Sequence, residues 1–259
     1  MSKKQDRSSL LYSVSQNFLT SRRLIERLVK KTGLSKQDTV LEIGAGKGHI
    51  TKVLSDCCER VIAYEIDKKL SERLNLQIAS NVQLYTADFL KCNLPKSAYK
   101  VFSNIPFSRT TEILHKLTNA SPLPDGMWLV MEKGAAKRFC GLPKENLNSI
   151  LLKPFFEANI IYYFKREDFH PAPRVDVVLL ELRRKELPDI QPTQKRDFYA
   201  FVSHGLRFGL FGARALLTKK QIAMALRLAG LPPIEPSGDI LYIQWLCLFR
   251  CWLQVNHRQ

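Results

Sequence analysis

The sequence contains no long hydrophobic run. No segment reaches the roughly eighteen uninterrupted apolar residues that a membrane-spanning helix needs. The N-terminal stretch MSKKQDRSSLLYSVSQ also holds no apolar core of the length found in secretory signals. We therefore expect a cytoplasmic protein without a membrane partner.

The sequence has no Cys-x-x-Cys pair among its six cysteines. Cys247 and Cys251 lie four residues apart on a predicted helix, but no pair of histidines accompanies them, so the pattern does not fit a zinc site. Free buried thiols in a reducing compartment explain these cysteines better. We expect no bound metal ion.

Acidic residues are in deficit. The chain has 24 Asp and Glu against 40 Lys and Arg, which gives a net charge of +16. Residues 1–184 hold 30 basic and 19 acidic groups, and residues 185–259 hold 10 and 5, so the excess is spread along the chain. A surplus of this size favours a polyanionic partner, most often nucleic acid, and we expect it to contact both parts.

Short apolar runs alternate with amphipathic stretches through the first two-thirds of the chain. This alternation predicts βαβ units and a parallel sheet that is covered on both faces. The strand-like runs are 39–43, 61–65, 82–85, 100–103 and 127–132. The helix-like stretches between them are 49–57, 67–75 and 109–117.

The remaining third of the chain changes character. Strand-like runs at 159–164 and 175–183, joined by the proline-bearing segment 168–174, predict an antiparallel hairpin at the edge of the sheet. The polar, proline-rich stretch 185–194 reads as a linker, and 196–208, 218–229 and 240–253 show helical periodicity. We expect a catalytic domain over residues 1–184 and a small helical domain over residues 185–259.

A glycine-rich turn follows the first strand-like run. In TVLEIGAGKGHIT, Gly44, Gly46 and Gly48 allow a tight turn and a close approach of a ligand to the backbone. The dinucleotide fingerprint requires G-x-G-x-x-G, whereas here the third glycine comes one position early and His49 takes its place. Pyrophosphate is therefore disfavoured, and S-adenosylmethionine, a nucleoside with an amino-acid tail, fits better. A plain glycine turn is the alternative for this motif alone.

Acidic residues lie at or just after the ends of the next two strand-like runs. Glu65 lies 21 residues after Gly44, where a carboxylate can accept both hydroxyls of a ribose. Asp88 follows the third run and is placed to accept from an adenine amino group, while Ile66 and Phe89 offer apolar walls. One such acid is equally typical of a helix cap. Two of them in register with a glycine turn indicate a nucleoside site.

The segment SNIPFSRT follows the fourth strand-like run. It suits methyl transfer to an adenine amine, whose lone pair is delocalised into the ring. Two acceptors that hold the amino hydrogens turn the lone pair toward the methyl group. Asn104 Oδ1 and the Ile105 carbonyl would be these acceptors, Pro106 would fix the turn, and Phe107 would stack on the extruded base. No nucleophilic side chain is required.

Seven motifs in this order resemble the rRNA adenine N6-methyltransferases, and among them most closely the erythromycin-resistance 23S rRNA methyltransferases. The motifs are SQNFL (15–19), LEIGAGKGHIT (41–51), AYEID (63–67), ADFL (87–90), SNIPFSRTTEI (103–113), LLKPFFE (151–157) and DFHPAPRVD (168–176). The resemblance covers roughly residues 8–183 and is looser beyond them. Phe107 stands where many relatives have Tyr, and VDVV (175–178) replaces a serine-containing version.

The resemblance implies an α/β, Rossmann-like class I methyltransferase with a mostly parallel seven-stranded sheet, an antiparallel edge hairpin and a small C-terminal helical domain that binds RNA. It implies S-adenosyl-L-methionine as the cofactor and a monomeric enzyme. The implied target is one adenine in the peptidyl-transferase loop of pre-ribosomal 23S rRNA. Mono- or dimethylation of N6 there would confer resistance to macrolides, lincosamides and streptogramin B.

The resemblance also assigns two sets of site residues. The cofactor set is Asn17, Leu19, Gly44, Gly46, Glu65, Ile66, Asp88, Phe89 and Asn104. The methyl-transfer set is Asn104, Ile105, Pro106, Phe107 and Phe169. In the second set Phe169 is the second aromatic against the target base, although an isolated phenylalanine is as typical of a core position. Basic residues after the fifth strand-like run, Lys133, Lys137 and Arg138, are candidate phosphate contacts.

Three alternatives stay open. The first is a housekeeping 16S rRNA adenine dimethyltransferase of the same superfamily, which typically has Leu at the position of Ile105. The stretch RFCGLPKENLNSILLKPFFE (138–157) favours the resistance group instead. The second alternative is a non-catalytic RNA-binding relative. The third, a nicotinamide-dependent dehydrogenase, is disfavoured by the glycine spacing and the charge.

Overall fold

The computed structural model describes residues 17–235 and 238–256. The chain divides into two compact units, of which one comprises residues up to Ala136 together with Asn159–Arg184. The other comprises Lys137–Ala158 together with Lys185 and the residues after it. One boundary coincides with the start of the linker expected at 185, whereas residues 137–158 group with the helical unit.

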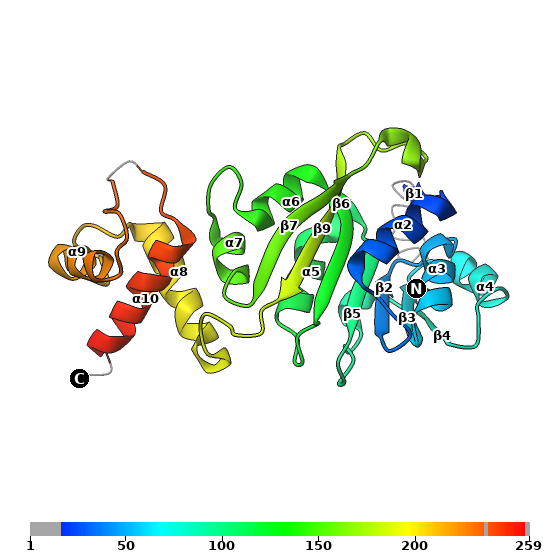
Figure 1. Cartoon of the computed structure of the whole chain (residues 1–259), viewed down its shortest axis with the longest axis horizontal. Helices are drawn as coiled ribbons and strands as arrows, with labels where there is room; N and C mark the ends of the chain where they lie inside the picture. Colours follow the sequence, from blue (N-terminus) through cyan, green and yellow to red (C-terminus); the bar gives the residue numbers. More distant parts are fainter. Residues whose placement is uncertain (1–16, 236–237, 257–259) are drawn as a thin grey trace, which may run out of the picture. The chain divides into compact units, whose positions relative to one another are not determined.

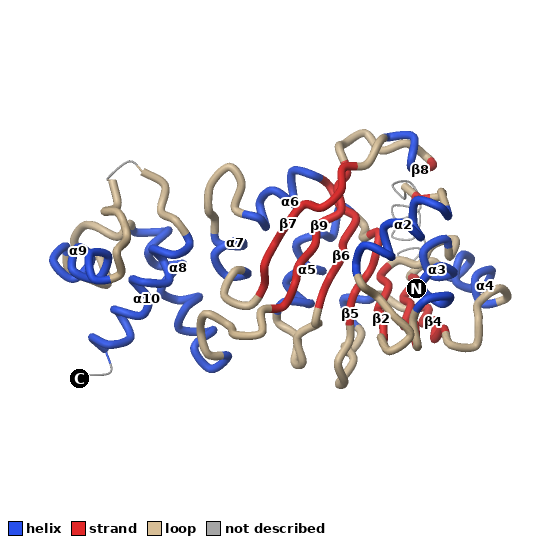
Figure 2. The backbone as a smooth tube through the Cα atoms, viewed as in Figure 1, coloured by secondary structure: helices blue, strands red, loops and turns tan. Residues whose placement is uncertain are grey.

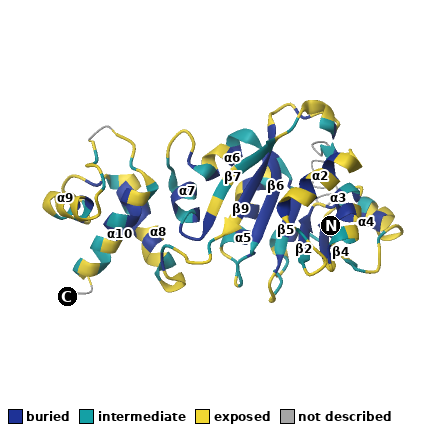
Figure 3. Ribbon diagram, viewed as in Figure 1, coloured by how far each residue is buried: buried dark blue, intermediate teal, exposed yellow. Residues whose placement is uncertain are grey.

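A seven-stranded sheet has the order β4-β3-β2-β5-β6-β9-β7 (Figure 1). Its strands are β2 (Thr39–Ile43), β3 (Arg60–Glu65), β4 (Val82–Thr86), β5 (Lys100–Asn104), β6 (Gly126–Glu132), β7 (Phe156–Tyr163) and β9 (Val177–Arg184). The first five pair in parallel, and β9 pairs antiparallel with β6. Strands β6 and β9 are buried along most of their length, as continuous apolar runs covered on both faces should be (Figure 3).

Strands β7 and β9 form the expected hairpin. The N–H of Phe164, just after β7, donates to the carbonyl of Val177 at 3.0 Å, and the N–H of Lys185, just after β9, donates to the carbonyl of Phe155 at 2.9 Å. Each bond joins the end of one strand to the start of the other, so the two strands run antiparallel. The predicted fold class is confirmed. The sequence did not predict that β9 lies between β6 and β7, which leaves β7 alone at the edge.

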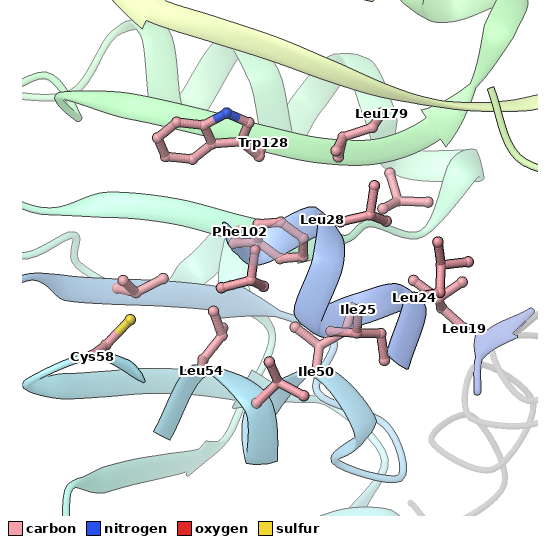
Figure 4. Packing of buried hydrophobic residues seen from close by; sticks show 14 of the residues in the cluster. Leu19, Leu24, Ile25, Leu28, Ile50, Leu54, Cys58, Phe102, Trp128 and Leu179 are labelled. Carbon is pink, nitrogen blue, oxygen red and sulfur yellow. The ribbon is translucent and has the colours of Figure 1, made fainter. Parts of the chain in front are cut away.

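Helices flank the sheet (Figure 2). They are α2 (Arg22–Thr32), α3 (His49–Cys57), α4 (Lys68–Asn75) and α5 (Thr110–Thr118). Helix α2 begins because Ser21 Oγ accepts from the N–H of Leu24, and it ends at Gly33, whose φ is 74°. Its buried stripe, which includes Ile25 and Leu28, packs with residues of α3 against Phe102 and Trp128 of the sheet (Figure 4).

A second, two-stranded sheet was not predicted from the sequence. Strand β1 (Phe18–Leu19) pairs antiparallel with β8 (Phe169–His170), and Leu19 lies opposite Phe169. Two residues per strand give no detectable hydrophobic period, so this pairing is a product of tertiary structure. It fixes the segment before α2 beside the proline-bearing segment that precedes β9.

The second unit contains the remaining helices. They are the end of α6 (Lys133–Cys140), then α7 (Leu147–Leu152), α8 (Lys195–Phe208), α9 (Lys219–Leu228) and α10 (Tyr242–Asn256). Aromatic rings form its core: Phe198 meets Phe249 edge-on at 5.0 Å between ring centroids, and Phe201 meets Trp245 at 6.2 Å. Within the described ranges, no helix has the length and apolar character to cross a membrane.

Candidate active site

Four predicted site segments meet at one edge of the sheet. Strands β2, β3, β4 and β5 are parallel, so their carboxyl ends lie at the same edge, where ligands bind in open α/β sheets. Gly44 follows β2, Glu65 ends β3, Asp88 follows β4, and Asn104 ends β5. The parallel direction of the strands therefore brings together residues that are up to sixty positions apart in sequence.

The glycine turn is shaped for a close approach. Gly44, Gly46 and Gly48 have φ values of 74°, 56° and 79°, a left-handed conformation that other residues rarely adopt. A Cβ at Gly46 would lie 2.6 Å from the ring of Phe18, so no larger residue fits there. A Cβ at Gly44 would by contrast meet only Pro106 Cδ, at 3.9 Å, and Gly44 lines the cavity at this edge.

Glu65 holds this turn in place through hydrogen bonds. Its side chain is 1% exposed, its Oε2 accepts from the N–H of Gly46 at 2.7 Å, and its Oε1 accepts from the N–H of Asp67 at 2.8 Å. Burial raises the pKa of Glu65, while these bonds and the Ile66 N–H oppose the rise. Because each carboxylate oxygen has a second lone pair, Glu65 can still accept a ribose hydroxyl from the cavity that it lines.

A short 3₁₀ turn, η1 (Phe89–Lys91), forms another part of the cavity wall. Asp88 caps it by accepting from the N–H of Leu90 at 3.0 Å and also lines the cavity. Phe89 is 5% exposed and meets Tyr64 edge-on at 5.5 Å. Asp88 therefore both caps η1 and lines the cavity.

Lys116 of α5 holds this wall in place. Its Nζ donates to the carbonyls of Phe89 at 2.8 Å, of Leu90 at 3.0 Å and of Cys92, and lies 5.0 Å from the centre of the Phe89 ring. Partial burial lowers the pKa of Lys116. The three ammonium protons thus match the three carbonyls to which Lys116 is bonded, and these bonds hold the end of η1 in position.

The side-chain amide of Asn104 is hydrogen-bonded at its nitrogen but not at its oxygen. Its Nδ2 donates to the backbone carbonyl of Asn17 at 2.7 Å, whereas its Oδ1 is buried and accepts from no residue in the described part of the chain. A buried acceptor without a donor is costly and is expected to meet a ligand. The amide is therefore held by its nitrogen, and its oxygen is left without a donor in a residue that lines the cavity.

Ser103 sets the position of this motif. Its hydroxyl donates to the Ile43 carbonyl at 2.6 Å and accepts from the Ile43 N–H at 3.1 Å. Regular pairing between β2 and β5 stops at Leu41 and Val101, so the side chain replaces the last ladder bonds as the strands separate. The separation opens the edge between the glycine turn and the Asn104 motif.

Ten predicted residues line one cavity. They are Asn17, Gly44, Glu65, Ile66, Asp88, Phe89, Asn104, Ile105, Pro106 and Phe107. Its other lining residues include Phe18, Tyr64 and Arg109, which sequence reasoning did not assign. All three lie within quoted motifs, Phe18 in SQNFL, Tyr64 in AYEID and Arg109 in SNIPFSRTTEI, but the resemblance assigned them no role.

Three predicted residues do not line the cavity. Gly46 contributes through its backbone N–H to Glu65, and Leu19, 2% exposed, belongs to the main hydrophobic core. Phe169 is 4% exposed, belongs to the same core and packs edge-on against Phe164 with ring centroids 5.3 Å apart. The structure thus places Phe169 where a core anchor belongs, and its stacking on a base stays a prediction.

A second buried carboxyl, Glu42, was also missed. It is 2% exposed, and its Oε2 has no hydrogen-bond partner among the described residues. Burial, with the nearby Glu65 carboxylate as a smaller cause, raises the pKa of Glu42 to about 8. The group is therefore largely protonated near neutral pH. The described residues include no group of three His, Cys, Asp or Glu side chains placed to hold a metal ion.

This strand order, with a glycine turn, acidic strand ends and an amide whose acceptor oxygen has no partner, is the architecture of a class I methyltransferase that uses S-adenosyl-L-methionine. Residues 8–206 match the family model described as ribosomal RNA adenine dimethylase. The chain belongs to this family, whose members methylate N6 of adenine in ribosomal RNA.

Individual relatives agree with this assignment. An rRNA adenine N-6-methyltransferase of Bacillus anthracis is 36% identical over 83% of this chain and 72% of its own length. One from Bacillus licheniformis is 32% identical over 92% and 86%. The crystal structure of the 23S rRNA methyltransferase ErmE matches with a TM-score of 0.80 at 27% identity, covering 92% of this chain and all of that one. A Plasmodium falciparum dimethyladenosine transferase (TM-score 0.70, 19% identity, 93% and 98% covered) shares the fold.

The cavity fits the methyl donor of the family. The Gly44 backbone, which lines the cavity without a side chain, suits its amino-acid tail, the Glu65 carboxylate suits its ribose, and Asp88 with Phe89 suits its adenine. The unpartnered Asn104 Oδ1 is left for a hydrogen-bond donor, and an adenine amine is one.

Proposed function

We propose that this chain methylates N6 of one adenine in the peptidyl-transferase loop of 23S rRNA and thereby confers resistance to macrolides, lincosamides and streptogramin B. Transfer to an adenine amine rests on the buried, unpartnered Oδ1 of Asn104. The choice of 23S rRNA rests on the similarity to ErmE over nearly the whole chain and on the stretch 138–157.

In the proposed reaction, S-adenosyl-L-methionine supplies an electrophilic methyl group. Asn104 Oδ1 and the Ile105 carbonyl accept the two amino hydrogens, which holds N6 with its lone pair out of conjugation with the ring. The bond from Asn104 Nδ2 to the Asn17 carbonyl keeps the amide from turning over. After transfer, N6 bears the extra proton, which is held at Asn104 Oδ1 until water removes it.

Phe107 would support the extruded base. Its ring is half-buried against the main core and lines the cavity, so one part is anchored and another is available for stacking. Pro106, with φ of −62°, precedes the short turn η2 (Phe107–Arg109), and Thr110 Oγ1 bonds the Phe107 carbonyl at 3.0 Å. The ring is therefore carried on a constrained backbone.

The target is tested by primer extension on 23S and 16S rRNA from a drug-sensitive host that expresses either the wild-type chain or Asn104→Ala. We expect a stop at one 23S adenine and macrolide resistance with the wild-type chain only. A stop confined to 16S rRNA would favour the housekeeping alternative. Resistance that survives Asn104→Ala, with no modified base in either RNA, would favour a non-catalytic RNA-binding protein.

A further inference from the structure

A basic and aromatic cluster lies at the end of α8 in the second unit. The Arg207 guanidinium carbon lies 5.1 Å and that of Arg214 5.0 Å from the centre of the Phe208 ring. The His204 ring is tilted against Phe208 at 4.8 Å, and its Nε2–H donates to the Arg214 carbonyl at 2.7 Å. We call these four residues, His204, Arg207, Phe208 and Arg214, the Phe208 cluster.

The cations of this cluster are ordered without being neutralised. Residues 198–234 contain five Lys and Arg but no Asp or Glu. Among the described residues, none of the ion pairs includes Arg207 or Arg214. An aromatic face attracts a guanidinium but leaves its N–H groups and its charge free for an anion.

The fold holds the two arginines together although seven residues separate them. Arg207 lies in the last turn of α8, and Arg214 lies in the loop beyond Gly209, whose φ is 80°. The bond from His204 to the Arg214 carbonyl ties that loop back to the helix. Both arginines are exposed, so a ligand can reach them.

The helix end gives a second explanation for these charges, because cations near a helix C-terminus stabilise it modestly. That effect needs no ring between the cations and acts on folding. Two guanidiniums beside one ring instead present two neighbouring sets of N–H groups, and arginine contacts nucleic-acid phosphates through such paired N–H groups.

We propose that the Phe208 cluster binds backbone phosphates of the substrate RNA at a segment separate from the target adenine. The identity of the bound RNA rests on the proposed function, whereas the binding of phosphates by the cluster does not. Its role is to hold a longer RNA on the enzyme, so it acts on affinity and not on the transfer step.

The test uses the full chain and measures equilibrium binding of unmethylated transcripts of the 23S peptidyl-transferase region and of 16S rRNA over a range of salt. Arg207→Gln/Arg214→Gln is compared with Lys30→Gln/Lys31→Gln, which removes the same charge from the exposed end of α2. We expect the cluster variant to lose about tenfold or more in affinity and to flatten the log–log salt slope by about 1.4 to 1.8, as loss of two phosphate contacts requires. The control pair should lose less than about threefold.

Phe208→Leu keeps both charges and removes the ring, and we expect several-fold weaker RNA binding with kcat at saturating RNA unchanged. Thermal unfolding is measured for every variant. Equal binding by the cluster and control variants would overturn the proposal. A lower Tm of the cluster variant with unchanged RNA affinity would also overturn it, because that is the result expected if the two arginines only stabilise the helix end. Preferential binding of 16S rRNA would refute the proposed target while leaving the cluster proposal intact.

Discussion

Asn104 Nδ2 donates to the backbone carbonyl of Asn17 at 2.7 Å, across 87 residues of sequence. The bond fixes which end of the amide faces the cavity, because a carbonyl accepts only from the NH2 group. The Oδ1 atom is thereby left buried and without a partner in the described chain. The segment before α2 thus orients the proposed methyl-transfer residue.

Asn104→Ala should lower kcat by at least about 100-fold, since it removes an acceptor that positions the amine. The affinity for S-adenosyl-L-methionine should change little. Methyl incorporation into RNA and calorimetric titration with the donor measure the two effects. Asn119→Ala, at an exposed asparagine after α5, is the control. A large loss of donor affinity in Asn104→Ala would make this residue a donor ligand instead.

Phe107→Ala should weaken stacking on the target base by about 1–3 kcal/mol, whereas Phe107→Tyr should be mild because the ring face remains. The quantity to compare is kcat/KM for RNA. Both variants should bind the donor as the wild type does. Equal loss in Ala and Tyr variants would show that stacking is not the role of this ring.

Phe169→Ala should instead destabilise the fold by about 3–5 kcal/mol, because the ring is 4% exposed within the main core. Chemical denaturation gives this value. The conservative Phe169→Leu should fold and retain most of its RNA affinity. If Phe169→Leu kept its stability and lost RNA binding, the base-stacking role inferred from sequence would be right and the core reading wrong.

Lys116→Met should raise KM for the methyl donor about tenfold or more, because three carbonyls at the end of η1 lose their common donor and the Asp88–Phe89 wall loosens. The RNA dissociation constant and kcat at saturating donor should stay within about threefold. Lys91→Met, in the same turn but exposed, is the matched control. An effect on RNA binding as large as that on donor binding would argue against this positioning role.

Glu42→Gln should flatten the pH dependence of stability. The folded chain keeps the Glu42 proton up to a pKa of about 8, while the unfolded chain releases it near 4.5. Stability from this group is therefore full at low pH and falls by up to about 1.4 kcal/mol per pH unit as pH rises through that window. Tm values at pH 5.5 and 8 measure the slope, with exposed Glu59→Gln as control. Identical slopes for Glu42→Gln and wild type would contradict a protonated Glu42.

The motifs and the strand–helix alternation determined most of the site, because parallel strands put their carboxyl ends at one edge whatever their order. That rule sufficed to group Gly44, Glu65, Asp88 and Asn104. The sequence also determined the hairpin of β7 and β9, through two apolar runs joined by a proline-bearing segment. These features are local in sequence, so periodicity and turn residues carry them.

Other features were decided by tertiary structure alone. The insertion of β9, the two-residue pairing of β1 with β8, and the burial of Phe169 all depend on contacts between distant segments. The grouping of residues 137–158 with the helical unit is of the same kind. Lys116 and the orientation of the Asn104 amide show the reason. Lys116 bonds three distant carbonyls and Asn104 bonds one, and such bonds leave no period or motif in the chain.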